Sequence, residues 1–234
     1  TPIPVGWSAD PSRGIRIERA EVSFNAEEAY PFSLQLNLSL RGKRLSCRAP
    51  FYCTHHAYAC GFVLGIAQTM GIPLSQKTDS FFENFQVPPG RGNILRSSSG
   101  CLLFDESYNA NPKSMGSSLS NFGRLPFSGR KVVLLGGMKE LGELSSKEHL
   151  HILSFFAPFD KIFLFGEEWH SQEICHQIER AGFLKKIELL DSLDEFFAQT
   201  RALSLGEGDA LFIKGSRSYG LERIVEEWEV CDGR

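Results

Sequence analysis

From Asn93 onward, short apolar runs alternate with longer segments of helical length. Such runs are typical of buried strands, and strands that alternate with helices form a mostly parallel, twisted sheet covered by helices. The second part of the chain is therefore predicted to be an α/β domain. Its strands are expected at 93–97, 101–104, 131–135, 161–165, 186–190 and 210–214. Its helices are expected near 112–122, 145–156, 168–182, 191–203 and 219–228.

The first part of the chain has a different pattern. Residues 15–24 and 32–40 alternate apolar with polar side chains, which is typical of half-buried strands, and a third strand is expected near 44–50. These strands predict a small antiparallel meander with one face exposed to water. The segment 88–92 is rich in proline and glycine and is the best candidate for a domain boundary.

A mostly apolar helix should follow the meander. Thr54 is suited to cap it and Gly71 to end it. Because most of its body is apolar, we expect the helix to be well buried. A second helix is expected to start near Ser75 and to continue through Phe85.

The composition excludes several classes of protein. A net charge of −3 gives no electrostatic case for nucleic-acid binding, and no apolar run reaches the roughly 20 residues that a membrane-spanning helix needs. The six cysteines include no Cys-x-x-Cys pair, which favours reduced thiols in a cytosolic protein. The N-terminus lacks both a methionine and the pattern of a signal peptide, so we expect the chain to be a fragment of a longer protein.

Polar residues crowd the segment that follows the predicted strand 101–104. They read Asp-Glu-Ser-Tyr-Asn-Ala-Asn-Pro-Lys-Ser-Met from Asp105 to Met115. Pro112 is suited to open a helix, so these polar groups should lie between the carboxyl end of a strand and a helix N-terminus, where ligands and anions bind in α/β sheets. An ordinary turn rich in asparagine is the alternative reading.

The whole string resembles the Asp-Asp-Ser-Tyr-Asn-Ala-Asn-Pro-x-Ser-Met signature of the Mur ligases, with Glu106 in place of the second Asp. Within the family it is most similar to the members that add D-alanyl-D-alanine to UDP-N-acetylmuramoyl-tripeptide. Leu135–Glu143 resembles the family's Leu-Gly-Asp-Met-x-Glu-Leu-Gly-Glu, with Gly137 in place of Asp. Ile213–Arg217 resembles its Val-Lys-Gly-Ser-Arg, and Gly90-Arg91 resembles the Gly-Arg that closes its central domain.

This resemblance implies an organisation and a site. Residues 1–91 would be the C-terminal part of the central, P-loop-type ATP-binding domain, and residues 92–234 would be the Rossmann-like C-terminal domain. The nucleotide would be contacted by Arg91, Asp105, Glu106, Tyr108, Asn109, Asn111 and His55. The substrates would be contacted by Lys214, Ser216 and Arg217. The family further implies ATP and Mg²⁺ as cofactors, a cytoplasmic monomer, and chemistry through an acyl phosphate.

Other features limit what this chain could do alone. Ala59 replaces an asparagine that helps to hold adenine in the family, and the phosphate-binding pattern Gly-x-x-x-x-Gly-Lys-[Ser/Thr] does not occur in the 234 residues. We therefore expect no catalysis by this chain and assign it no catalytic residue. Cys53, His55 and His56 suggest a metal site, but no second ligand pair follows them, so we favour a packing role. A sibling ligase that adds a single amino acid or a folate glutamate, and a binding module without catalysis, are the alternatives.

Overall fold

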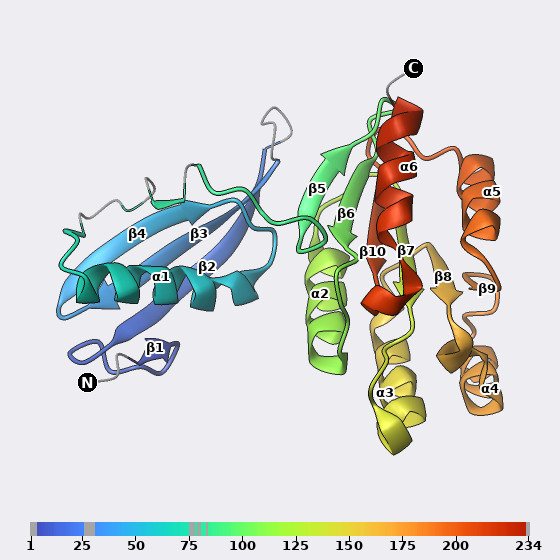
Figure 1. Ribbon diagram of the computed structural model, residues 1–234, viewed down its shortest axis with the longest axis horizontal. Helices are drawn as coiled ribbons and strands as arrows, with labels where there is room; N and C mark the ends of the chain where they lie inside the picture. The colour runs from blue at the N-terminus through green and yellow to red at the C-terminus, as the bar shows by residue number, and fades with distance from the viewer. Residues whose placement is uncertain (1–3, 26–30, 75–77, 79–80, 83, 233–234) are drawn as a thin grey trace. The chain divides into compact units, whose positions relative to one another are not determined.

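The computed structural model describes residues 4–25, 31–74, 78, 81–82 and 84–232, and for 229–232 it describes the backbone alone. The chain divides into two compact units, Thr1–Val87 and Pro88–Arg234. Each unit has its own sheet (Figure 1).

The sheet of the first unit contains the predicted meander. Its strands are β1 (Val5–Gly6), β2 (Ile15–Phe24), β3 (Phe32–Leu40) and β4 (Lys43–Ala49), in the order β1-β2-β3-β4. Strands β2, β3 and β4 pair antiparallel as expected. The two-residue β1 pairs parallel to β2 and was not predicted, because two residues are too few to show a periodic pattern.

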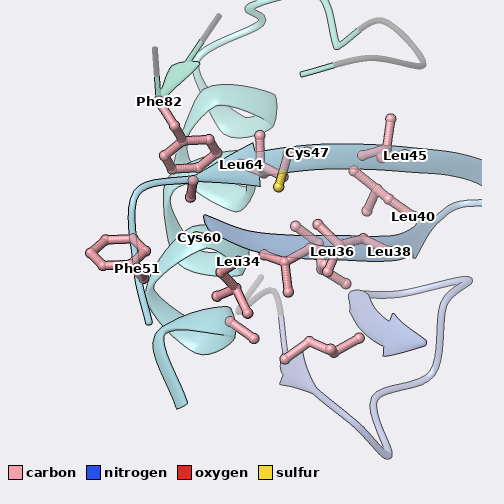
Figure 2. Packing of buried hydrophobic residues seen from close by; sticks show 14 residues of the cluster. Leu34, Leu36, Leu38, Leu40, Leu45, Cys47, Phe51, Cys60, Leu64 and Phe82 are labelled. Atoms are coloured by element: carbon pink, nitrogen blue, oxygen red, sulfur yellow. The ribbon is translucent and has the colours of Figure 1, made fainter. Parts of the chain in front are cut away.

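Helix α1 (Ala57–Thr69) covers one face of this sheet. Figure 2 shows leucines of β3 packing with Cys60 and Leu64 of the helix in the core of the unit. The expectation that α1 is well buried is wrong for its other face, where Phe62 is 55% exposed, Ile66 60% and the adjoining Met70 71%. A helix that packs on one sheet buries only the stripe that faces the sheet, whatever the composition of its other side.

The ends of α1 confirm one prediction and correct another. Gly71 follows the helix with φ +74°, a left-handed conformation that glycine adopts without strain, and it ends the helix as expected. Thr54 does not cap it, because Thr54–His56 form a 3₁₀ turn that runs directly into α1. The second predicted helix, from Ser75 to Phe85, falls largely on residues outside the described ranges.

The second unit is the predicted α/β domain. Its strands have the order β5-β6-β10-β7-β8-β9, with β5 antiparallel and the others parallel. They are β5 (Asn93–Arg96), β6 (Leu102–Glu106), β7 (Lys131–Gly136), β8 (Lys161–Phe165), β9 (Ile187–Leu190) and β10 (Ala210–Lys214). The helices are α2 (Pro112–Arg124), α3 (Ser145–Ile152), α4 (Gln172–Arg180), α5 (Leu193–Leu203) and α6 (Glu222–Asp232).

Helices cover both faces of this sheet (Figure 1). On one face, the Phe122 ring of α2 lies 5.1 Å from the ring of Phe104 and 5.2 Å from that of Phe212, and α3 and α4 continue this layer. On the other face, Phe196 of α5 lies 5.2 Å from Phe163, and residues of α6 join the same core. The sheet is therefore buried on both sides, which explains why its strands read as continuous apolar runs.

An ion pair fixes the amino ends of β7 and β10. Arg130 Nη2 donates to Asp209 Oδ2 at 2.6 Å, and the backbone N–H and Nε of Arg130 donate to Oδ1. Burial raises the pKa of Asp209, but the hydrogen bonds from Arg130 outweigh this effect and hold the pKa below its usual value. The pair therefore stabilises the sheet at the amino ends of its parallel strands, opposite to the carboxyl ends that carry the sequence motifs.

Two further findings concern the part of the chain that the structure describes. None of its helices is both long and apolar enough to cross a membrane. Its cysteines are all free thiols: Cys47, Cys53, Cys60, Cys101 and Cys175.

Candidate functional site

Two of the sequence motifs meet at the carboxyl edge of the second unit's sheet. Strands β6 and β10 are neighbours and run parallel, and their register places Lys214 opposite Glu106. The loops that leave these strands therefore start side by side, although more than 100 residues separate them in the sequence. Strand β7, which precedes the third motif, pairs with the other side of β10.

Glu106 and Lys214 form a buried ion pair at this edge. Lys214 Nζ lies 2.9 Å from Glu106 Oε2, and the side chains are only 6% and 9% exposed for the lysine and the glutamate. The Ser118 hydroxyl donates to the same carboxylate oxygen at 2.6 Å, and Lys214 Nζ donates to the carbonyl oxygen of Asn109 at 3.0 Å. Each charge is thus paired and hydrogen-bonded, as burial demands, and the pair joins the loop after β6 to the end of β10.

Asp105 holds the turn that carries Arg91. Its Oδ2 accepts the backbone N–H of Gly90 at 2.9 Å, its Oδ1 accepts that of Ser107 at 3.0 Å, and its carbonyl oxygen accepts that of Gly92 at 2.8 Å. The residue is 3% exposed. Asp105 can therefore act on a ligand only by positioning its neighbours, because its carboxylate faces into the unit.

Tyr108 lies near two arginines. Its ring is reached by the guanidinium carbons of Arg91 and Arg217, 3.9 and 5.0 Å from the ring centroid. Gly90 permits the close approach, because it has φ +73° and an added Cβ would lie 2.9 Å from the Tyr108 nitrogen. Both arginines are exposed, Tyr108 is 39% exposed, and neither arginine has a carboxylate partner among the described residues. Two guanidinium groups at an exposed ring form a surface suited to an anion or a flat polar ligand.

The two asparagines of the motif have separate roles. Asn109 is exposed, and its side-chain oxygen accepts the N–H of Ala110 at 2.8 Å. Asn111 is the N-cap of α2: its side-chain oxygen accepts the N–H of Ser114 at 2.9 Å, and the Ser114 hydroxyl accepts the N–H of Asn111 at 3.2 Å. With Pro112 in the first turn, this reciprocal cap explains where α2 begins.

Ser216 connects the β10 motif to the β7 motif. It is 8% exposed, and its backbone N–H donates to the carbonyl oxygen of Gly137 at 3.0 Å. Its hydroxyl accepts a hydrogen bond from the hydroxyl of Ser218 at 3.3 Å. Of the three residues that the sequence assigns to the substrates, Arg217 is therefore the exposed one.

His55 belongs to the first unit, in the 3₁₀ turn before α1, and is exposed. Its ring lies 4.2 Å from the ring of His56, which stacks on Phe51 at 4.3 Å. The rings of His55 and His56 therefore pack against neighbouring aromatic rings. Across the described parts of both units, no three His, Cys, Asp or Glu side chains gather as ligands of one metal ion.

One cluster at this edge was not found from the sequence. Lys139, after β7, lies 2.6 Å from the Glu168 carboxylate after β8, and the hydroxyl of Tyr219 donates to the same carboxylate. Glu168 belongs to none of the motifs, and the strand pattern alone could not place its side chain beside Gly137. The sequence feature that could have indicated this cluster is Gly137, because a missing side chain leaves space for another group.

The chain belongs to the Mur ligase family. The family model described as "Mur ligase, glutamate ligase domain" matches residues 90–217, which include all three motifs of the second unit. This membership confirms the resemblance and the predicted fold class.

Two curated relatives of this chain have the same name. A protein of Treponema pallidum named UDP-N-acetylmuramoyl-tripeptide–D-alanyl-D-alanine ligase is 30% identical over 194 residues, which cover 79% of this chain and 40% of the relative. A protein of Borreliella burgdorferi with the same name is 34% identical over 139 residues, which cover 58% of this chain and 28% of the relative.

Solved structures show the same fold. The MurF ligase of Thermotoga maritima in complex with ADP has a TM-score of 0.73 at 22% identity, over 97% of this chain and 48% of that one. MurF from Acinetobacter baumannii has a TM-score of 0.76 at 22% identity, over 97% and 46%. The chain thus spans less than half the length of the relatives and structures that it matches.

Proposed function

We propose that this chain is the C-terminal part of an ATP-dependent ligase that adds D-alanyl-D-alanine to UDP-N-acetylmuramoyl-tripeptide in the cytoplasm during peptidoglycan precursor synthesis, acting as a monomer. In that reaction the γ-phosphate of ATP passes to the tripeptide carboxylate. The amine of the dipeptide then attacks the acyl carbon, and phosphate leaves as the amide forms. The names of the relatives and the matching motifs support this branch of the family over ligases that add one amino acid or a folate glutamate.

The arrangement at Tyr108 is the observation that carries the proposal. Arg91 and Arg217 both reach its ring and keep their charge free of any carboxylate in the described chain. They lie at the carboxyl edge of a parallel sheet, where α/β domains bind ligands. Nucleotide phosphates and the dipeptide carboxylate are anions that paired guanidinium hydrogen bonds recognise.

The predicted residues divide into two roles within this proposal. Arg91, Tyr108 and Asn109 are exposed and would contact the nucleotide, while Arg217 would contact the dipeptide. Five others would hold these groups in place, because their side chains are hydrogen-bonded within the unit or buried: Asp105, Glu106, Asn111, Lys214 and Ser216.

The two cofactors fit this chain differently. ATP fits the exposed arginines and tyrosine as a polyanion with a flat base. Magnesium ligands are assigned to none of the residues, since the described part of the chain offers no suitable cluster of carboxylates. The chain alone is expected to hydrolyse no ATP, because the phosphate-binding glycine-rich pattern is absent from its sequence.

Calorimetric titration of the 234-residue chain tests the proposal, with ADP–Mg²⁺ and D-alanyl-D-alanine as separate ligands. Losing a charge-assisted hydrogen bond costs about 1.5–3 kcal/mol, so Arg91→Ala should weaken ADP binding roughly 10- to 100-fold. Arg217→Ala should weaken dipeptide binding by a similar factor. Arg124→Ala is the matched control, because this exposed arginine ends α2, far along the helix from the motif at its start.

Three results would contradict the proposal. The first is that neither ligand binds the unmodified chain. The second is that Arg124→Ala weakens binding as much as Arg91→Ala. The third is that the chain alone hydrolyses ATP in the presence of Mg²⁺. The first two remove the ligand site from this edge of the sheet. The third would mean that phosphate transfer does not need residues outside this chain.

A further inference from the structure

The side-chain space of Gly137 is filled by a carboxylate from another loop. Gly137 follows β7, and a Cβ added to it would overlap Oε2 of Glu168, lie 2.7 Å from Cδ of that residue and lie 3.0 Å from the hydroxyl oxygen of Tyr219. Gly137 is not among the glycines with positive φ, so its backbone conformation does not require glycine. A side chain at this position would instead require the Glu168 carboxylate and the Tyr219 hydroxyl to move.

Two groups hold the Glu168 carboxylate where a side chain of residue 137 would lie. Lys139 Nζ lies 2.6 Å from Oε1, and the hydroxyl of Tyr219 donates to Oε2. Burial raises the pKa of Glu168, but these two hydrogen bonds outweigh it and hold the pKa below its usual value. Burial and the bond to this carboxylate raise the pKa of Tyr219 to about 12. Near neutral pH the carboxylate is therefore charged and the phenol is a donor.

The same carboxylate is linked to the loop after β10. The Tyr219 N–H donates to the carbonyl oxygen of Ser216 at 3.0 Å, and the Ser216 N–H donates to that of Gly137 at 3.0 Å. The Gly137 N–H donates to the carbonyl oxygen of Phe165, at the end of β8, at 2.9 Å. Glu168 thus binds Tyr219 and fills the space beside Gly137, and the backbone of Ser216 is hydrogen-bonded to both of these residues.

We infer that Glu168 is a positioning residue that replaces a side chain at position 137 and fixes the Lys214–Arg217 loop through Tyr219. The Mur ligase motif carries Asp where this chain has Gly137, so the carboxylate at this edge is supplied by a different strand end. The placement of Glu168 in this space rests on geometry, whereas the comparison with Asp rests on the resemblance of Leu135–Glu143 to the family motif. Its importance for ligand binding rests on the proposed function, which assigns this loop to the dipeptide.

The inference predicts that Gly137→Asp and Glu168→Ala compensate each other. Gly137→Asp alone places two carboxylates in one space and should lower the thermal midpoint of the 234-residue chain by roughly 5 °C or more. Glu168→Ala alone leaves Lys139 without its buried partner and should also lower it. The double variant should recover at least half of either loss. Glu167→Ala is the matched control, since Glu167 pairs with the same lysine at 2.9 Å but is 84% exposed.

Amide hydrogen exchange separates positioning from general stability. Glu168→Ala should lower protection of the Ser216 N–H at least about tenfold more than that of the buried strand amide of Val133, which reports the change in global stability, and the double variant should restore it. Tyr219→Phe removes the hydroxyl but keeps the ring, and should reproduce the local loss of protection even if a Glu168 variant fails to fold.

The inference is overturned if Gly137→Asp is tolerated beside an intact Glu168, if the double variant is no better than the worse single variant, or if Tyr219→Phe leaves the Ser216 amide unchanged. Dipeptide titration of the same chains distinguishes the two proposals. If no chain binds the dipeptide but the compensation holds, the proposed function fails while the role of Glu168 stands.

Discussion

Replacing Lys214 by methionine should destabilise the second unit more than any surface substitution. Methionine has nearly the volume of the lysine stem but carries no charge and donates no hydrogen bond. The Glu106 carboxylate would then lose its cationic partner although its side chain is only 9% exposed, and the Asn109 carbonyl would lose the hydrogen bond from Lys214 Nζ.

The magnitude follows from the geometry. Unit charges 2.9 Å apart attract by about 6 kcal/mol at an effective dielectric constant of about 20. Removing both charges from water costs several kcal/mol for each, so the intact pair adds little net stability. Removing only the lysine eliminates the attraction but leaves the dehydration of Glu106, for which the usual cost is about 3–5 kcal/mol. For a unit of this size, that corresponds to a fall of roughly 6–20 °C in the thermal midpoint.

Urea unfolding monitored by the fluorescence of Trp169 and Trp228, the two tryptophans of the second unit, measures this cost. Trp169 is fully buried in the second unit, and a Trp7→Phe background removes the tryptophan of the first unit. The matched variant is Glu106→Gln/Lys214→Met, which neutralises both partners while keeping their size. It should lose much less stability than Lys214→Met, because no charge is left buried without a partner.

Two results would refute the reasoning. One is a cost of less than about 1 kcal/mol for Lys214→Met, the value expected of an exposed ion pair. The other is a loss in the double variant as large as the sum of Lys214→Met and Glu106→Gln, which would mean that the two charges do not interact. Either result would show that solvent reaches the pair.

Three further predictions concern other parts of the molecule. Asp209→Ala should lower the free energy of unfolding by roughly 1–3 kcal/mol in urea titrations, because it removes the carboxylate that Arg130 binds through three donors. Burial lowers the pKa of His149 below its usual 6.5, so the folded chain should lose stability as the pH falls below about 6.5, and unfolding curves from pH 7 to 5 should show a smaller loss for His149→Gln. Leu64→Ala should cost about 2–5 kcal/mol in the first unit, whereas Ile66→Ala, on the exposed face of the same helix, should change its stability by less than about 0.5 kcal/mol.

The fold of the second unit was readable from the sequence because its strands are buried on both faces. Each of the six strands lies within two residues of its predicted position, since continuous apolar runs bounded by glycine and polar residues leave little choice. The strand order could not be predicted from the sequence. Strand β10 lies between β6 and β7 and so brings Lys214 to Glu106. This order depends on tertiary packing, which no local sequence pattern shows.

The first unit shows a different limit. Composition predicted a buried α1, but the helix has one covering sheet and exposes Phe62 and Ile66. The apolar content of a helix indicates how much of its surface could be buried. The number of layers that pack against the helix determines how much of it is buried. Thr54 failed as a cap for a related reason: the chain enters α1 through a 3₁₀ turn, so no extended residue precedes the helix at that point.

The sequence motifs select residues that the structure brings to one end of the sheet, but they do not show how each side chain is packed. Motif matching placed Lys214 and Arg217 in one substrate group, yet the structure buries the first against Glu106 and exposes the second beside Tyr108. Sequence similarity cannot make this distinction, because a residue that holds a loop and a residue that touches a ligand are equally parts of the motif. Burial and hydrogen-bond partners do make it, and they lead to different experiments. An exposed residue such as Arg217 should change affinity with little change in stability, whereas substitution of Lys214 should change stability first and affinity as a consequence.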